Sequence, residues 1–403
     1  MATPAPPTKG TLTSSMPVRS AAFTAGIIAL AHGVNDSYAA FLSPLLPRVM
    51  EKLGLTIALA ATLAMTLSLA ASLLQPLMGY LSDRYGRRFF VVLGPLLSAV
   101  FLSLIGVAPT FWILVVFLLL GGLGSAVFHP PAASMAVRVS EGKGSALRMS
   151  VFSLGGSLGW AIGPLVAVGL VGWLGLEMLW VAMVPGILVA LVVFPLLPPG
   201  RTDAGARLPP SPAMGVRRLR GPLGLLFGIS TVGAFTQRVF LTMVPISAAW
   251  AGASEAAGAL ALSLYLGAQT VGTLAGGVLA DRMDRNRLLA GLTLLAFPAH
   301  FLSVAATPGE VPAYILACVA GFFGMAMMPA IVVRAQELSP DSAAVGSAIV
   351  MGLAWAAGSL GVLGTGALAD WIGPQPAAMV SMPALLLGTA LALHPSLRER
   401  TRS

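Results

Sequence analysis

The residues best suited to chemistry are ionisable side chains set inside long apolar segments. His32, Asn35 and Asp36 interrupt the apolar stretch 20–48, and Tyr38 follows two residues later. On a helix, His32 and Asp36 stand at i and i+4 and therefore share one face, about one turn apart. A carboxylate held beside an imidazole can load and release protons, so the pair predicts proton exchange. The alternative interpretation is that these side chains only form hydrogen bonds with neighbouring helices.

His129 is a further candidate because Pro130 and Pro131 follow it in an otherwise apolar segment. Prolines free backbone carbonyl groups, which a membrane helix tolerates where it lines a cavity. Imidazole exchanges protons near neutral pH. We expect His129 either to join a proton path with Asp36 or to pack as a satisfied core histidine. His300 and His394 lie towards the ends of apolar segments, where interfacial positions are expected.

Arg238 places a guanidinium in the middle of another apolar stretch, next to Gln237. An arginine keeps its charge and therefore needs an anionic partner, carbonyl groups or a bound anion. Asp36 and an anionic ligand are the candidates, and Gln237, Asn35 and Tyr38 are candidate ligand contacts beside it. The alternative is that Arg238 reaches an interface along its aliphatic stem.

The composition excludes an ordinary soluble protein. The 403 residues are 57% hydrophobic and 9% charged, whereas soluble domains are about 45–50% apolar and about 25% charged. A single cysteine, Cys318, and four scattered histidines leave no disulfide and no Cys/His metal framework. We therefore expect a protein of the lipid bilayer with no metal, no cofactor and no nucleic-acid partner.

A helix needs about 20 apolar residues to cross the hydrocarbon of a bilayer. On this measure the expected spans are 20–48, 56–82, 88–107, 110–138, 143–171, 175–197, 221–250, 255–281, 286–305, 311–338, 341–370 and 374–394. They divide the chain into a disordered tail (1–18), a six-helix bundle (19–197), a linker (198–220), a second six-helix bundle (221–394) and a second tail (395–403).

Lys and Arg are distributed unevenly between alternate loops. Of the 23 Lys and Arg residues, 20 fall on the side that holds both termini and the linker, whereas Arg48 and Lys52 fall on the other side. Cytoplasmic loops carry the excess of positive charge. This predicts that both termini and the linker are cytoplasmic and that the protein lies in the cell (inner) membrane.

Two pairs of motifs show that the chain is duplicated. The run GYLSDRYGRR at 79–88 is echoed by GVLADRMDRNR at 277–287, and GSLG at 156–159 by GSLG at 358–361. Asp83 and Asp281 are 198 residues apart and Gly156 and Gly358 are 202 apart, which is half of the chain in each case.

The first loop motif resembles the signature of the major facilitator superfamily of secondary transporters. The HxxND pattern ending at Asp36, Gln75-Pro76, Phe128-His129-Pro130 and Gln336-Glu337 are similar to the fosmidomycin-resistance branch. The resemblance runs from about Phe23 to Leu393. It implies an all-α membrane protein with twelve transmembrane helices in two pseudo-symmetric six-helix bundles.

We expect a transporter that exports small molecules in exchange for protons by alternating access, as a monomer. Arg238 and the apolar segments around it favour amphiphilic or anionic compounds, and uptake fits the same residues as well as export does. The loop residues would form a conformational switch: Gly79, Asp83, Arg84, Gly86, Arg87, Arg88, Asp281 and Arg282. In this family the aspartate of the motif faces the start of the eleventh helix, here Ser339-Pro340-Asp341. The glycine-rich run 155–163 resembles an antiporter signature only in part, and ordinary close packing explains it equally well.

Two other functions are weighed. Uptake or exchange of an organic anion would make Arg238 its main ligand. A membrane-embedded enzyme would need a nucleophile with a base, or a metal cluster such as HExxH, and the sequence has neither.

Overall fold

The computed structural model describes residues 21–139, 145–198, 219–339 and 343–397, and within them every regular element is a helix. The tail 1–18 and nearly all of the linker 198–220 lie outside these residues. The helices of the first half are α1 (Ala21–Ala39), α2 (Leu42–Leu53), α3 (Ile57–Leu73), α4 (Gln75–Tyr85), α5 (Arg87–Ser103), α6 (Phe111–Val139), α7 (Ser145–Leu174) and α8 (Met183–Leu196). Those of the second half are α10 (Pro222–Trp250), α11 (Glu255–Arg282), α12 (Arg285–Ala305), α13 (Val311–Ala326), α14 (Met328–Glu337), α15 (Ala343–Ser347), α16 (Ala354–Ile372), α17 (Pro374–Ser381) and α18 (Ala384–Ala392).

Each of the twelve expected segments contains helix, but several are broken. Ten helices of the described chain are long and apolar enough to cross a membrane, and an eleventh span is the pair α3 and α4, bent by 41°. The bend falls where Pro76 occupies the first turn of α4 and can donate no backbone hydrogen bond. The first expected span is likewise divided, between Ala39 and Leu42.

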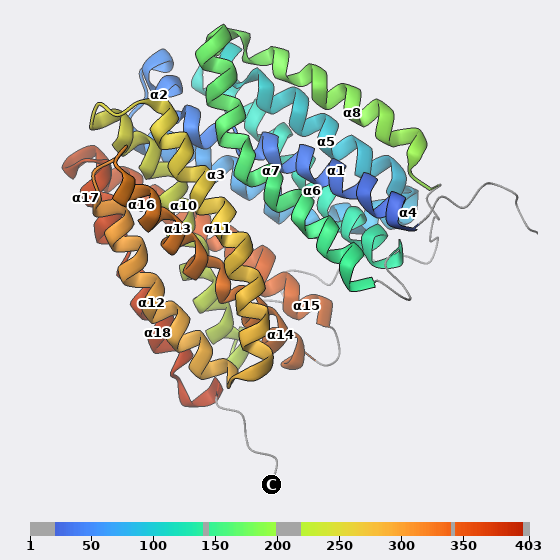
Figure 1. The fold of residues 1–403 in the computed structure, drawn as a ribbon, viewed down its shortest axis with the longest axis vertical. Helices are drawn as coiled ribbons and strands as arrows, with labels where there is room; N and C mark the ends of the chain where they lie inside the picture. The colour runs from blue at the N-terminus through green and yellow to red at the C-terminus, as the bar shows by residue number, and fades with distance from the viewer. Residues whose placement is uncertain (1–20, 140–144, 199–218, 340–342, 398–403) are drawn as a thin grey trace, which may run out of the picture.

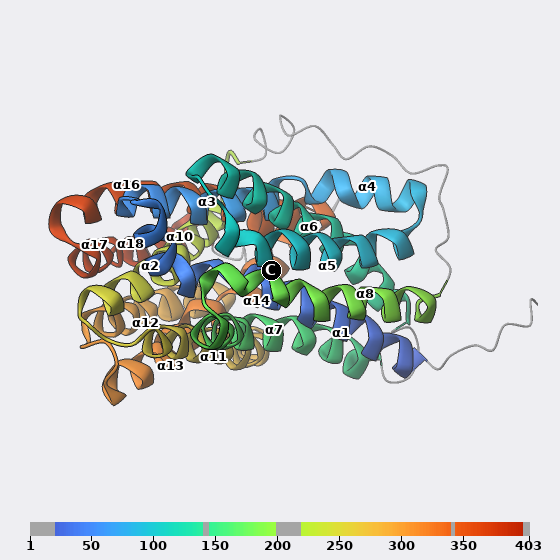
Figure 2. The same cartoon turned by 90° about the horizontal axis from the view of Figure 1, so that it is seen from above.

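The two halves form two bundles that meet at one end. Figure 1 shows α1–α8 in blue to green and α10–α18 in yellow to red, close together near α2 and α17 and spread apart towards α4 and α14. Figure 2 shows α3 beside α16 where the bundles meet. We call the region around α2 and α17 the joined end, and the region around α4 and α14 the separated end.

Burial of apolar side chains follows the same division. One cluster of buried residues draws from both halves, and it contains Leu45 and Ile57 together with Phe240 and Leu262. A second cluster belongs wholly to α10 and the elements after it. A third cluster belongs wholly to the first half. Its residues lie on α1, α5, α6, α7 and α8 and at Leu197, which directly follows α8. The halves therefore share a core at the joined end and keep separate cores elsewhere.

Close contact between α1 and α7 positions the polar residues of α1. A Cβ atom added at Gly159 would lie 2.1 Å from the carbonyl oxygen of Gly33, and one at Gly155 would lie 2.3 Å from that of Ala29. The small residues four apart on α7 thus let its backbone touch that of α1, as expected of such a stripe.

We expect Gly159→Val to destabilise the protein by about 1–3 kcal/mol or more, because the new side chain cannot fit without moving α7 away from α1. Gly169→Val on the same helix is the matched control, since nothing lies within 4 Å of a Cβ there. Thermal unfolding of the purified protein in detergent measures both. Equal midpoints for the two variants would contradict the packing argument.

Candidate functional site

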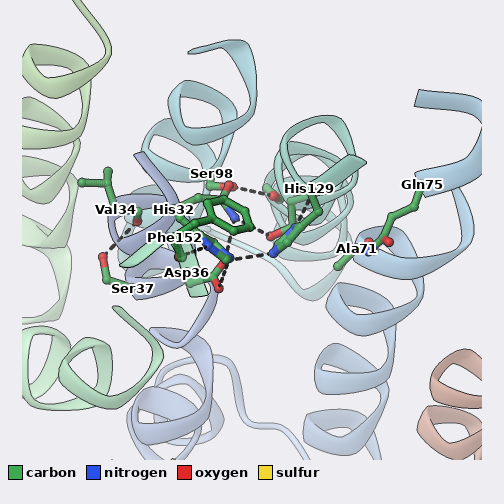
Figure 3. Close-up of polar contacts among 12 residues, drawn as sticks. His32, Val34, Asp36, Ser37, Ala71, Gln75, Ser98, His129 and Phe152 are labelled. Carbon is green, nitrogen blue, oxygen red and sulfur yellow. Dashed lines mark hydrogen bonds and ion pairs between the residues drawn. The ribbon is translucent and has the colours of Figure 1, made fainter. Parts of the chain in front are cut away.

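Asp36 is the centre of a buried polar cluster on α1. One of its carboxylate oxygens lies 3.2 Å from Nε2 of His32, and the other lies 3.3 Å from Nε2 of His129 on α6. Figure 3 shows both imidazoles directed at the carboxylate. The predicted grouping of these three residues is therefore present in the structure.

The other ring nitrogens of the two histidines fix how the cluster can hold protons. Nδ1 of His32 lies 2.9 Å from the carbonyl oxygen of Phe152, and Nδ1 of His129 lies 2.8 Å from that of Ser125. A carbonyl oxygen can only accept, so we assign a proton to each Nδ1. Each Nε2 is then free to exchange a proton with Asp36.

Counting protons gives the charge of the cluster. Two protons, one in each contact between Nε2 and the carboxylate, satisfy both hydrogen bonds and give a net charge of +1. With no proton in either contact, two nitrogen lone pairs face a carboxylate, and the net charge is −1. The two contacts, at 3.2 and 3.3 Å, lie at the long end of the range for N–H···O hydrogen bonds. The three ligand atoms lie within 4.8 Å of one another, as a small cation would also require, but hydrogen bonds already account for them.

His129 is the most exposed residue of this cluster. The side chain of His129 is 31% exposed, whereas those of His32 and Asp36 are 12% and 5% exposed. His129 follows directly after the fully buried Phe128 on α6. A proton path by way of His129 stays a prediction.

Asn35 holds Asp36 in place. Its side-chain nitrogen donates to Asp36 at 2.9 Å and to Ser125 at 3.1 Å, and its oxygen accepts from Ser98 at 3.0 Å. Tyr38 donates to the carbonyl oxygen of Ala182 at 2.5 Å. Both side chains are buried in the first bundle and hydrogen-bonded to its helices, and their predicted contact with a ligand stays a prediction.

Arg238 on α10 lies in the second bundle and is not paired with Asp36, whose carboxylate is occupied by the two histidines. Among the described residues no carboxylate lies within 4.0 Å of its guanidinium, and its buried Nε has no hydrogen-bond partner. The guanidinium carbon stands 5.9 Å from the ring of Trp355, a cation–π contact. Asp36 is therefore not the partner of Arg238 in this structure, and a bound anion stays a prediction.

Other buried polar atoms without a hydrogen-bond partner occur on α10, α11 and α16. Nε1 of Trp355 is buried without a partner. Gln237 donates to Gln269 at 3.0 Å, which leaves the oxygen of Gln237 and the amide nitrogen of Gln269 unpaired. Trp355 and Gln269 were not among the predicted site residues. A polar glutamine inside the apolar span 255–281 could have indicated Gln269.

His300 differs from its expected interfacial position. It is 1% exposed, its Nε2 lies 3.1 Å from the hydroxyl of Tyr265, and its Nδ1 lies 2.8 Å from the carbonyl oxygen of Ala296. Tyr265 stacks on Phe240 with ring centroids 3.9 Å apart. The histidine is therefore a packed, satisfied core residue beside the Arg238 region.

The loop motif is ordered within its own half. Arg87 donates to Asp83 at 2.7 Å, and Arg88 donates to the carbonyl oxygen of Phe194 at 2.8 Å. Gly86 has φ of +110°, a conformation that favours glycine. Arg84 donates to Tyr80 at 2.9 Å. The predicted partners Pro340 and Asp341 of the switch lie outside the described residues, and Asp281 and Arg282 are exposed.

Two bundles of apolar helices, joined at one end and carrying ionisable groups inside, define the class of secondary membrane transporters. The family model described as Major Facilitator Superfamily matches residues 27–342, and the chain belongs to this superfamily. It is therefore a transporter and not an enzyme.

Two curated relatives extend over almost the whole chain. The chain is 26% identical over 377 residues to the Fosmidomycin resistance protein of Escherichia coli (strain K12), covering 90% of each chain. It is 27% identical over 388 residues to an uncharacterized MFS-type transporter, YfnC, of Bacillus subtilis (strain 168), covering 92% of each chain.

Solved structures share the fold. A bacterial homologue of the human lysosomal transporter Spinster, in an inward-facing and unoccupied conformation, superposes with a TM-score of 0.75 at 18% identity, covering 92% of this chain and 96% of that one. The nucleoside transporter NupG gives 0.72 at 14% identity, covering 92% and 98%.

Proposed function

We propose that this protein is a proton-coupled efflux antiporter of small amphiphilic or anionic compounds. The observation that carries the proposal is the carboxylate of Asp36 held between two imidazoles inside the first bundle. Similarity to a fosmidomycin resistance protein supports the direction of transport. Alternating access would come from movement of one bundle against the other.

The cluster links protonation to helix packing. His32 lies on α1 and bonds to α7 through Phe152, while His129 lies on α6. Loss of the two shared protons would set lone pairs against the carboxylate at both contacts and weaken the joint between these helices. Antiport requires that proton loading favour the conformation that releases substrate, and this joint gives protons such a preference.

The region of Arg238 is the proposed binding site for an acidic group on the substrate. Three donors without partners, Arg238 Nε, Trp355 Nε1 and the amide nitrogen of Gln269, need an acceptor. A carboxylate or phosphonate accepts several hydrogen bonds, and charge-assisted bonds are the stronger ones.

A second candidate function is uptake or exchange of an organic anion. With two protons the Asp36 cluster carries +1, and Arg238 adds a second positive charge. Electrostatics then favours binding the anion together with the protons, which is symport. In the antiporter, binding of the substrate and binding of protons must instead compete through conformation. The sign of the pH gradient that drives accumulation separates the two candidates.

For orientation, we propose that the joined end faces the outside of the cell and that both termini face the cytoplasm. Lys52 and Glu177 lie together at the joined end, 3.3 Å apart, where positive charges are few. The structure then corresponds to an inward-facing state, the state named for the Spinster homologue.

Labelling of single cysteines tests this orientation in a Cys318→Ala background. A cysteine at Glu177 should react with a membrane-impermeant maleimide on intact cells, because the residue is exposed at the joined end. A cysteine in the linker, at Ala204, should react only after the cells are opened. The reverse pattern would invert the topology.

Asp36→Asn should abolish proton-driven transport while the protein still folds, because the amide keeps the hydrogen bond to Asn35 but cannot cycle a proton. Transport of fosmidomycin, chosen for the named relative, is measured in vesicles under an imposed pH gradient. Ser37→Ala is the control, since that hydroxyl bonds only to its own helix. Accumulation at the wild-type rate by Asp36→Asn would exclude Asp36 as the coupling group.

Arg238→Gln should lower transport of an organic acid by about ten- to a hundredfold, the value of a lost charge-assisted hydrogen bond, and spare the corresponding neutral amide. Arg238→Lys should keep weak transport of the acid, because the charge remains without the planar fork. Transport of the acid and of its amide is compared at equal protein level. Equal loss of both compounds in Arg238→Gln would assign the residue to the structure instead of the substrate.

A further inference from the structure

The start of α3 is capped by a residue of the opposite bundle. The backbone N–H of Ile57 donates to one carboxylate oxygen of Asp370 at 2.7 Å, and that of Ala58 donates to the other at 3.2 Å. The next N–H, of Leu59, donates to Thr56 of its own turn at 3.3 Å. The first N–H groups of a helix have no partner within the helix. Two of the backbone N–H groups at the start of α3 therefore depend on a residue of α16 for their hydrogen-bond acceptor.

The contact is built into the packing of α3 on α16. A Cβ atom added at Gly366 would lie 2.5 Å from Cβ of Ala61, so glycine is required for this approach. Further along the same pair of helices, the hydroxyls of Ser68 and Ser359 lie 2.6 Å apart. The carboxylate also meets the positive end of the α3 dipole.

A second contact between the bundles lies at the same end. Arg48, which belongs to α2, forms an ion pair with Glu255 in the first turn of α11. Both members of the pair are partly exposed, so its contribution is modest. At the separated end, the ion pairs of the described residues stay within one half, as Arg87 with Asp83 and Arg285 with Glu337 do.

The sequence around Asp370 repeats the loop motif of the first half. GALADWIG at 366–373 matches GYLSDRYG at 79–86 at glycine, leucine, aspartate and glycine, with the same spacing. In both copies the aspartate stands three residues before a glycine of positive φ, +110° at Gly86 and +90° at Gly373. The first copy ends α4 at the separated end, and this copy ends α16 at the joined end (Figure 1).

We propose that Asp370 is a latch that keeps the joined end closed. Opening of this end would draw α16 away from α3 and leave the N–H groups of Ile57 and Ala58 without their carboxylate. The latch stabilises the closed state by the difference in free energy between α3 with its cap and α3 without it. It therefore biases the equilibrium between the two conformations. This proposal concerns the conformational equilibrium alone and does not depend on the substrate or on the coupling ion.

Distance measurements by electron paramagnetic resonance test the latch. Spin labels at Glu51 and Ala251, exposed residues of the two halves at the joined end, report its opening in the full-length Cys318→Ala protein in lipid nanodiscs. Asp370→Ala should raise the ratio of long to short distances about fivefold, as expected for loss of a helix cap. Asp370→Asn should shift it less, because an amide oxygen still accepts hydrogen bonds.

Asp284→Ala is the matched control, because Asp284 caps α12 within its own half by accepting from the N–H of Arg287 at 2.8 Å. It should lower the thermal midpoint and leave the distances unchanged. An unchanged distance distribution in folded Asp370→Ala would overturn the latch, as would an equal shift in Asp284→Ala. Transport is measured separately on the same variants, so a failure of the antiporter proposal would leave a shifted distance distribution intact.

Discussion

The structure depends on keeping a carboxylate inside a membrane bundle. A charged aspartate at the centre of a membrane helix costs about 2.5–3.5 kcal/mol on insertion scales. Here the carboxylate of Asp36 meets two imidazoles and one amide within 3.3 Å. His32 and Asn35 lie on α1, His129 lies on α6, and His32 bonds to Phe152 of α7, so the contacts of one carboxylate connect three helices. The glycines of α7 let its backbone approach α1 closely, which brings Phe152 within reach of His32.

The two bundles carry different kinds of charge. The first holds a carboxylate between two imidazoles, which are groups of a kind that exchanges protons, and the second holds an arginine, which keeps its charge. A variable charge suits coupling to a proton gradient, whereas a fixed charge suits recognition of a ligand. The two groups do not form an ion pair in this structure, so bundle movement or a bound solute would have to link them if they are coupled by contact.

The sequence predicted neighbouring side chains where two ionisable residues lie one helical turn apart. The pairing of His32 with Asp36 followed from a spacing of four residues, and His129 was indicated by the prolines after it. Spacing could not show that Asn35 points at Asp36 and Ser98, because the direction of a side chain depends on which helices surround it. The same limit explains His300, whose apolar neighbours gave no sign of the hydroxyl of Tyr265, 35 residues away. The contact from Asp370 to Ile57 spans 313 residues, and no local pattern encodes such a distance.

The distribution of apolar burial explains why one end can open while the other stays shut. At the separated end each bundle completes its own core, so parting the bundles there exposes little apolar surface that was shared. At the joined end one core includes side chains of both halves, and opening it would expose that surface to water, at about 25 cal/mol for each Å². A transporter that alternates between two arrangements would have to offset the loss of this shared core with contacts that form only in the opposite state. The contacts of Asp370 and Arg48 add to the apolar surface that holds the joined end closed.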